Sequence, residues 1–358
     1  MTYPNIASET QLQTLVLTVD DIRSIITQVG LDALMDEMII RLAQAFRQFD
    51  AAKTVVPVRT GFSYEQPHVG LLEWMPLFEK YRQIVVKAVG YHPKNPKVNC
   101  LPNVLSTVSA YDPASGHLSA IMDGTFLTAL RTGAASAIAS QHLALPQSKV
   151  LGLIGVGAQA ITQLHGLSRC FNLQQILIFD NDLTVSHSFV DRIACLGLHN
   201  LDLQVANIEE VASKSDILCT ATSVEVGRGP VLLDQGLKPW LHVNAVGADF
   251  PGKFEVPLSV LERSFICPDF RDQAIREGEC QQLQDVKLIG PELSDVVKQP
   301  HQYQSCQQQL TVFDSTGFAL EDQVAMAIML NYATELNVGT LVELESVAEV
   351  QNPYSFVF

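Results

Sequence analysis

The stretch KVLGLIGVGAQA, from Lys149 to Ala160, constrains the fold more than any other part of the chain. A short apolar run breaks here into Gly155-x-Gly157-x-x-Ala160, which is typical of the strand-to-helix turn in dinucleotide-binding domains. Gly155 permits the tight turn, Gly157 lets backbone N–H groups approach a pyrophosphate, and Ala160 lets the helix pack close to the sheet. The unpaired N–H groups at the start of the helix then suit a phosphate group.

A carboxylate follows at the distance that this motif requires. The run from Gln175 to Asp180 is predicted to be the next parallel strand, and it ends in Asp180. In this place an Asp can accept hydrogen bonds from both ribose hydroxyls, whereas a 2′-phosphate would meet like charge. We therefore predict NAD rather than NADP as the cofactor. The alternative is that Asp180 is an ordinary turn residue at the end of a strand.

Length and composition indicate a two-domain globular protein. The chain has 358 residues, too many for one typical compact domain, with 47% hydrophobic and 17% charged residues. A net charge of −15 argues against a nucleic-acid partner, because a phosphate backbone would be repelled. No signal peptide or membrane-spanning run is visible, which predicts a cytoplasmic protein that does not bind membranes.

The cysteines and histidines do not indicate a metal centre. The seven cysteines include no Cys-x-x-Cys pair, and the nine histidines include no His-x-x-x-His pattern. We predict reduced, mostly buried thiols and no bound metal.

The first part of the chain is predicted to be a helix followed by an antiparallel sheet. Leu17 to Asp21 resembles a helix start with Thr18 as its cap, and residues 31–49 repeat apolar residues at helical spacing. Runs typical of β-strands follow at 55–62, 69–75 and 84–89, and a hairpin joins 104–111 to 117–123 through a turn containing Pro and Gly.

The rest of the chain alternates strands with helices. A helix is predicted at 125–143, a second after the glycine motif at 159–170, and a long closing helix at 319–336. The candidate strands lie at 150–154, 176–180, 201–206, 217–221, 241–246, 265–267 and 310–314. We therefore predict an α/β fold with a Rossmann-type, doubly wound parallel sheet, beside an α+β domain whose sheet is mostly antiparallel.

Three cations stand in otherwise apolar surroundings: Arg59, Lys87 and Arg131. Such groups could hold the carboxylate of a small anionic substrate. For Lys87 the pattern leaves two possibilities open. Strand alternation places Val86 and Ala88 on the opposite face, so Lys87 either faces solvent or is buried and paired.

Two carboxylates raise the same question. Glu73 lies in an apolar strand, and Asp249 follows the predicted strand 241–246 at its carboxyl end, where open α/β sheets bind ligands. Asp249 can also be a turn residue before Pro251 and Gly252. Its position favours a function.

Several motifs together resemble the ornithine cyclodeaminase and μ-crystallin family, and within it the ornithine cyclodeaminase branch most. The resemblance covers the chain from about Arg59 to the closing helix. The motifs that carry it are Glu73-Trp-Met-Pro76, Lys87-Ala-Val-Gly-Tyr-His-Pro-Lys-Asn95, Leu127-Thr-Ala-Leu-Arg-Thr132, Gly155-Val-Gly-Ala-Gln159, Asn244-Ala-Val-Gly-Ala-Asp-Phe-Pro-Gly-Lys253 and Asp314-Ser-Thr-Gly-Phe-Ala-Leu-Glu-Asp322.

The resemblance implies a homodimer that acts on a small amino acid. Residues 1–130 and 320–358 would form the substrate-binding and dimerisation domain, and residues 131–319 would bind NAD. Lys87, Asp249 and Glu73 would be catalytic, with Asp249 as general base or amine ligand and Glu73 assisting proton transfer. The implied substrate-binding residues are Arg59, Met75, Lys87, Arg131 and Asp249. The implied cofactor-binding residues are Thr132, Gly155, Gly157, Ala158, Gln159, Asp180, Ala221, Thr222, Val246, Gly247, Lys253 and Ser315.

The activity implied by the resemblance is NAD-dependent conversion of L-ornithine to L-proline and ammonia, with a hydride removed and then returned. Lysine remains an alternative substrate, because one methylene in a pocket contributes only ~1 to 3 kcal/mol. Two other functions stay open. One is an amino-acid dehydrogenase or cyclic ketimine reductase with net turnover of NAD(H), and the other is a non-catalytic, crystallin-like binding protein.

Overall fold

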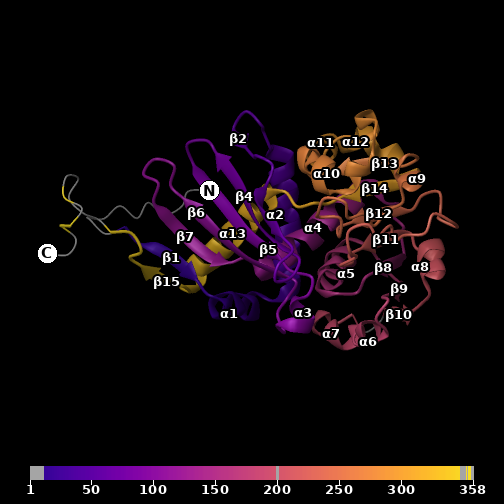
Figure 1. Ribbon diagram of the computed structural model, residues 1–358, viewed down its shortest axis with the longest axis horizontal. Coiled ribbons are helices and arrows are strands. Elements are labelled where there is room, and N and C mark those ends of the chain that lie inside the picture. Colours follow the sequence, from indigo (N-terminus) through magenta and orange to yellow (C-terminus); the bar gives the residue numbers. More distant parts are fainter. Residues whose placement is uncertain (1–11, 199–200, 347–351, 353, 356–358) are drawn as a thin grey trace.

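The structure is a computed structural model that describes residues 12–198, 201–346, 352, 354 and 355. It contains two β-sheets with their covering helices, and these two parts lie side by side along the long axis of the molecule (Figure 1).

The first sheet has the strand order β15-β1-β7-β6-β5-β4-β2, with β3 paired to β4. Its pairs are antiparallel except that β1 runs parallel to β7. The strands are β1 (Thr14–Leu17), β2 (Thr54–Val55), β3 (Thr60–Tyr64), β4 (Gly70–Glu79), β5 (Gln83–Tyr91), β6 (Val104–Tyr111), β7 (Leu118–Asp123) and β15 (Thr340–Val342). The prediction of a mostly antiparallel sheet is confirmed.

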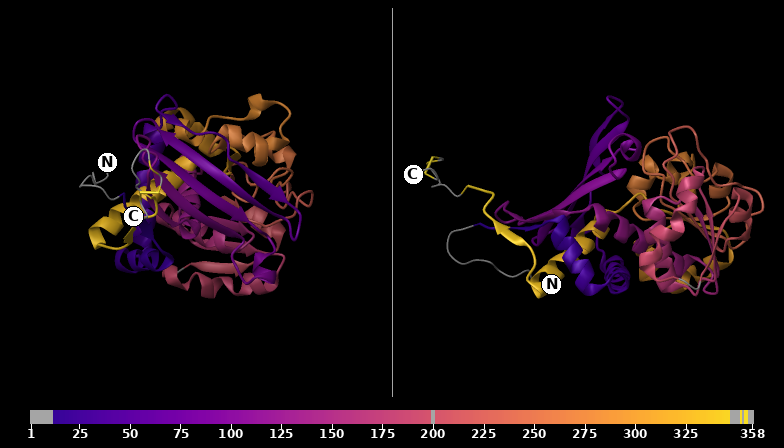
Figure 2. Two further views of the ribbon diagram at one scale, coloured as in Figure 1. Left: turned by 60° about the vertical axis from the view of Figure 1, so that its left-hand side comes forward. Right: turned by 90° about the horizontal axis from the view of Figure 1, so that it is seen from below.

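Helices cover one face of this sheet. Figure 2 shows α1 (Val19–Val29), α2 (Leu31–Gln48) and α13 (Ala319–Leu336) on the same side of it. The predicted cap of α1 is confirmed, because the Thr18 side chain accepts a hydrogen bond from the Asp21 N–H, and the Asp21 carboxylate accepts one from the Thr18 N–H. Two further helices complete this region, α3 (Asn95–Val98) and α4 (Thr125–Leu143).

The two faces of the first sheet differ in what they contact. On β5, Val85, Lys87 and Val89 point toward the helices and are buried, whereas Val86 and Ala88 on the other face stay partly exposed. The question that the sequence left open is therefore answered. Lys87 lies on the buried face with a side chain only 1% exposed, and its neighbours Val86 and Ala88 point outward.

The second sheet is entirely parallel, with the order β10-β9-β8-β11-β12-β14-β13. Its strands are β8 (Val150–Ile154), β9 (Gln175–Phe179), β10 (Asp202–Val205), β11 (Ile217–Thr220), β12 (His242–Ala245), β13 (Phe265–Pro268) and β14 (Thr311–Asp314). The order reverses between β8 and β11, so these two strands flank the point where open α/β sheets bind dinucleotides.

Helices pack on both faces of the parallel sheet. Leu164 of α5 and Phe189 of α7 belong to the core on one face, and Val211 of α8 and Val260 of α9 belong to the core on the other. The predicted doubly wound arrangement is confirmed. The helices are α5 (Ala158–Cys170), α6 (Leu183–His187), α7 (Phe189–Arg192), α8 (Ile208–Lys214), α9 (Leu258–Leu261), α10 (Arg271–Glu277), α11 (Leu293–Lys298) and α12 (Pro300–Tyr303), with short 3₁₀ segments at Ala194–Leu196, Glu279–Gln282, Val286–Leu288 and Gln304–Gln308.

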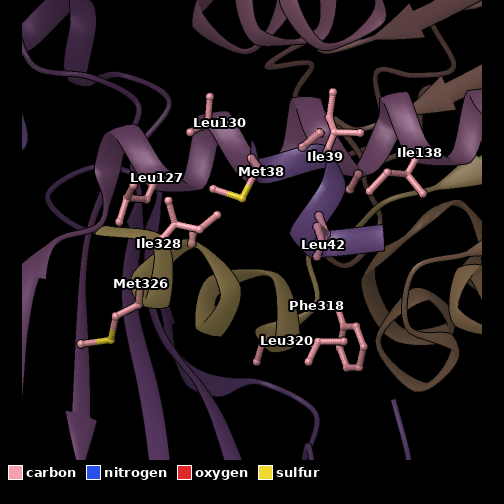
Figure 3. Close-up of a cluster of buried hydrophobic side chains, with 14 of the residues drawn as sticks. Met38, Ile39, Leu42, Leu127, Leu130, Ile138, Phe318, Leu320, Met326 and Ile328 are labelled. Atoms are coloured by element: carbon pink, nitrogen blue, oxygen red, sulfur yellow. The ribbon is translucent and has the colours of Figure 1, made fainter. Parts of the chain in front are cut away.

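The two parts are joined by a shared apolar core. Figure 3 shows side chains of α2, α4 and α13 meeting, among them Leu42, Leu130 and Ile328, all buried. Phe318, just before α13, stacks on Phe270 with ring centroids 5.0 Å apart and so extends this core to the parallel sheet. Burial of these side chains holds the amino-terminal end of α13 against the part of the chain that contains the parallel sheet.

Some sequence predictions need correction or remain predictions. The run 55–62 is two short strands separated by Pro57, which has no N–H to donate to a neighbouring strand. Strand β1 precedes the first helix and was not predicted. The predicted domain boundary at 130–131 falls inside α4 and remains a prediction. In the described part of the chain, no helix is long and apolar enough to cross a membrane.

Candidate active site

The glycine motif forms the turn between β8 and α5. Gly155 has φ +82°, a conformation that favours glycine, and donates its N–H to the Phe179 carbonyl at 2.9 Å. Gly157 is the N-cap of α5 and has no side chain to cap the helix. A methyl group added to Gly157 would meet no protein atom within 4 Å. The first turn of α5 is therefore open to a phosphate group, as a dinucleotide requires.

Asp180 lies beside this turn. Its carboxylate accepts hydrogen bonds from the N–H groups of Val156 and Asp182, each at 3.0 Å. The side chain remains partly exposed at the end of β9. This is where an adenosine ribose meets an acidic residue in dinucleotide-binding folds, so the geometry fits NAD.

The other predicted cofactor residues lie along the same edge of the sheet or on the adjoining helices. Ala221 and Thr222 follow β11, Val246 and Gly247 follow β12, and Ser315 follows β14. Ala158 and Gln159 begin α5, and the Gln159 side chain donates to the Ala129 carbonyl of α4 at 3.3 Å. Thr132 of α4 is buried, with its hydroxyl donating to the Thr128 carbonyl at 2.8 Å.

Two predicted substrate cations form a buried cluster with two acids of α13. The Lys87 ammonium contacts both carboxylate oxygens of Asp322 at 2.9 Å. Arg131 of α4 donates to Glu321 at 2.6 Å and lies 3.3 Å from Asp322. All four side chains are 6% exposed or less, and Met75 is buried opposite Lys87 in the β4–β5 register. Strand β5, helix α4 and helix α13 thus jointly position this cluster.

Burial controls protonation in this cluster. Burial, reinforced by the nearby Arg131 guanidinium, lowers the pKa of Lys87 to about 8, although Asp322 opposes the shift. Burial also raises the pKa of Glu321 to about 8 against the opposing effect of Arg131. Both groups can therefore change charge in the pH range where enzymes usually work.

Arg59 lies in a second cluster of opposite charges. Its Nε donates to Glu277 at 2.5 Å and lies 3.2 Å from Glu73, and its guanidinium also donates to the carbonyls of Asp249 and Thr316 at 3.0 and 3.2 Å. Burial raises the pKa of Glu73, although Arg59 counteracts it. Arg59 precedes β3, so these bonds bring the first sheet to the strand ends of the second.

Asp249 and Lys253 form the third group. The Lys253 ammonium lies 3.0 Å from the Asp249 carboxylate and 5.0 Å from the centre of the Tyr91 ring. Burial would lower the pKa of Lys253, but Asp249, Tyr91 and Glu255 together outweigh it and raise that pKa above its usual value. Asp249 is 30% exposed, the most accessible carboxylate of the three clusters.

The segment 315–317 connects the clusters. The Asp269 carboxylate accepts hydrogen bonds from the Gly317 N–H at 2.6 Å and the Thr316 hydroxyl at 3.1 Å, and the Arg131 guanidinium lies against Gly317. Arg59 binds the carbonyl of Thr316 on the same segment. The predicted substrate residues are therefore close to one another and to the cofactor side of the sheet.

Several residues of the site were not predicted. The residues that contact predicted residues directly are Glu277, Asp269, Glu321, Asp322 and Tyr91. The sequence signal for these residues was weak. It was strongest for Glu321 and Asp322, which are adjacent acids at the start of a mostly apolar helix. In the described part of the chain, no group of three or more His, Cys, Asp or Glu side chains is placed to hold a metal ion.

The fold and the site together define a dinucleotide-binding protein. Buried charged side chains lie beside the ends of the strands where the cofactor would bind. The sequence matches the ornithine cyclodeaminase/mu-crystallin family over residues 19–336. The chain belongs to this family, as the resemblance predicted.

Known members of the family are similar to this chain over nearly its whole length. L-Lysine cyclodeaminase of Streptomyces rapamycinicus is 41% identical over 346 residues, which cover 96% of this chain and 100% of that protein. A solved structure on the recognition of L-lysine, L-ornithine and L-2,4-diaminobutyric acid by lysine cyclodeaminase has a TM-score of 0.93, with 45% identity, 96% coverage of this chain and 99% of that chain. An archaeal alanine dehydrogenase dimer with bound NAD has a TM-score of 0.81, with 30% identity, 93% coverage of this chain and 100% of that chain.

Proposed function

We propose that the protein is an NAD-dependent cyclodeaminase, which converts an L-α,ω-diamino acid into a cyclic amino acid and ammonia. The observation that carries the proposal is the convergence of Arg59, Lys87 and Arg131 with Asp249 and Glu277 around segment 315–317. L-Lysine is the first substrate to test, because the similarity to L-lysine cyclodeaminase covers nearly the whole chain. L-Ornithine, implied by the sequence motifs, is the second.

The distribution of charge favours a diamino acid over alanine. The α-carboxylate of the substrate would bind beside Lys87 and Arg131. Near Arg59 the site contains two carboxylates, Glu73 and Glu277, against one guanidinium, and Asp249 close by is paired with Lys253. This surplus of negative charge suits a second ammonium group, which alanine does not have.

NAD, when bound, accepts a hydride from the α-carbon and later returns it to the cyclic imine. The distal amine must lose a proton before it attacks the α-carbon and displaces ammonia. Asp249 is the base best placed for this step, because it is the most exposed carboxylate of the three clusters, and Lys253 holds its side chain at 3.0 Å. Lys87 and Arg131 would hold the substrate carboxylate and keep the α-carbon oriented toward the cofactor.

The test is turnover of L-lysine and of L-ornithine, in parallel, with NAD⁺ supplied far below the substrate concentration. Ammonia, cyclic product and NADH absorbance are followed together. The proposal predicts ammonia and L-pipecolate or L-proline in large excess over the NAD⁺ supplied, without accumulation of NADH. An NADH yield that matches the product, or activity with alanine alone, would instead make the protein a dehydrogenase.

A variant tests the role of Asp249. Asp249→Asn keeps the size of the side chain but removes the base, so turnover should fall by at least about a hundredfold while NADH binding changes little. Asp216→Asn is the matched control. Asp216 lies at the amino ends of the parallel strands, away from the candidate site, where it accepts the N–H of Lys149 at 2.9 Å. Unchanged activity of Asp249→Asn would remove Asp249 from the mechanism.

We further propose that the protein is a homodimer formed through the open face of the first sheet. That face carries Leu72, Trp74, Val86, Ala88 and Leu105, which are apolar and partly or largely exposed, and the helices lie on the other side (Figure 2). Exposed apolar side chains that gather on one face of a sheet are typical of an interaction surface. Light scattering coupled to size-exclusion chromatography should give about twice the chain mass of 39.3 kDa.

A further inference from the structure

Glu255 is a fully buried carboxylate with no assigned role. Its Oε1 accepts hydrogen bonds from the N–H and the hydroxyl of Thr222, at 2.7 and 2.6 Å, and its Oε2 accepts one from the Gly247 N–H at 2.9 Å. One side chain therefore ties together the segments that leave β11 and β12. These two segments lie next to each other at the carboxyl ends of the parallel strands, where a dinucleotide would bind.

Glu255 also closes a loop. After β12 the chain passes through Gly247, Asp249 and Lys253, and at Glu255 it comes back to Gly247. The bond from Gly247 to the Glu255 carboxylate thus joins the two ends of the segment that carries the candidate base. A methyl group on Gly247 would lie 2.4 Å from that carboxylate, so any other residue here would push the Glu255 side chain out of its present position.

The backbone of Glu255 is fixed as firmly as its side chain. Its N–H donates to Glu279 at 2.7 Å, and its carbonyl accepts from the N–H groups of Val231 and Leu232, each at 2.9 Å. The carboxylate therefore extends from a rigid anchor and cannot easily follow a moving loop. It sets the position of Thr222 and Gly247 instead.

All three donors require an acceptor. An amide in place of the carboxylate would turn an NH₂ group toward at least one N–H or hydroxyl, because both carboxylate oxygens accept hydrogen bonds. A buried donor left unpaired in this way is costly, so the two segments should separate from the substituted side chain.

We propose that Glu255 is a positioning residue that holds the β11 and β12 segments, and with them Asp249 and Lys253, in the geometry that binds the nicotinamide half of the cofactor. The adenosine half would contact the β8–α5 turn and Asp180, whose hydrogen bonds run to one another and to Phe179 and Asp182. This inference rests on the proposed use of NAD.

The experiment compares two ligands in the full-length protein. NADH binding is measured by fluorescence titration, and ADP binding, which probes the adenosine half alone, by calorimetry. Glu255→Gln should weaken NADH binding by at least about tenfold and leave ADP binding within about twofold of the wild type. A loss of overall stability without a positioning role would not produce this split between the two ligands.

Asp216→Asn is again the matched control. It also replaces a carboxylate that accepts backbone N–H groups across strands, from Lys149 and Val150 at 2.9 and 3.1 Å, but at the amino end of β8. It should change the affinity for neither ligand. The inference is overturned if Glu255→Gln binds NADH like the wild type, if it loses both ligands equally, or if Asp216→Asn shows the same split.

A second variant keeps the test decisive should Glu255→Gln fail to fold. Thr222→Val removes the hydroxyl, which donates to Glu255 and accepts the Val224 N–H at 3.3 Å, and the backbone bond from Thr222 to Glu255 stays in place. It should weaken NADH binding by about threefold or more with ADP binding unchanged, and unaltered NADH binding would overturn the inference. A wild-type protein that binds no NADH would refute the proposed function itself, which is a different outcome.

Discussion

Asp322→Ala should lower the free energy of unfolding by about 3 to 5 kcal/mol, the usual cost of removing one partner of a buried ion pair. The Lys87 ammonium lies 2.9 Å from both carboxylate oxygens, and the two side chains are 1% and 2% exposed, so water cannot replace the lost partner. The change leaves the buried Lys87 amine beside the positive Arg131 without its carboxylate partner, so the amine either stays charged and unpaired or gives up its proton, and both are unfavourable.

Two further variants separate this explanation from a simple loss of packing. Lys87→Met should cost less than Asp322→Ala, because Asp322 keeps Arg131 as a partner at 3.3 Å. The double variant Lys87→Met/Asp322→Leu removes both charges and should regain most of the stability, since apolar replacements of buried pairs are often neutral or better. It should nevertheless be inactive, because the proposed site needs the ammonium.

The assay is urea unfolding at pH 7 and one fixed protein concentration, followed through Trp74 in β4 and Trp240 before β12. Fluorescence from the two residues reports on both parts of the chain. A loss below about 1 kcal/mol for Asp322→Ala would refute the reasoning, as would a double variant less stable than either single variant.

Three other predictions address the cofactor turn, the pH dependence and the dimer. Gly157→Ala should leave unfolding unchanged within about 0.5 kcal/mol, because its methyl meets no protein atom, yet weaken NADH binding about tenfold or more in a fluorescence titration. The value of kcat/KM should fall above about pH 8 as Lys87 loses its proton. Asp322→Asn should move this fall in kcat/KM to lower pH, because it removes the charge that favours the ammonium. A fall at the same pH in both proteins, measured in a pH–rate series, would contradict this. Val86→Asp should convert the dimer to a monomer in light scattering, and a dimer that persists would place the interface elsewhere.

Most helices and strands follow from local sequence patterns. The helices at 125–143 and 319–336 have the bounds that the sequence predicts, because each is a long stretch rich in apolar residues that favour helices, Ala and Leu above all. Short elements were harder to predict. Strand β1 has four residues, and its pairing with β7 depends on contacts about a hundred residues apart in the chain, which no local pattern records.

The candidate site was predictable only in part, for a similar reason. Strand β5 is apolar on both faces, so alternation could not decide which face is buried and hence where Lys87 points. The answer depends on Asp322, which lies 235 residues further along the chain. Glu277 likewise reaches Arg59 only through the tertiary fold. The cofactor edge was easier to predict, because its glycines and Asp180 belong to one local strand–turn–helix–strand pattern.

The central claim is that one hydride leaves the α-carbon of a diamino acid and returns to the same carbon. It is tested most directly with L-lysine and L-ornithine deuterated at the α-carbon, incubated with a catalytic amount of unlabelled NAD⁺ and analysed by mass spectrometry. The account predicts L-pipecolate or L-proline that retains deuterium at the α-carbon, with ammonia released and no net NADH formed. Deuterium accumulating in NADH in proportion to product, or a cyclic product without label, would contradict it.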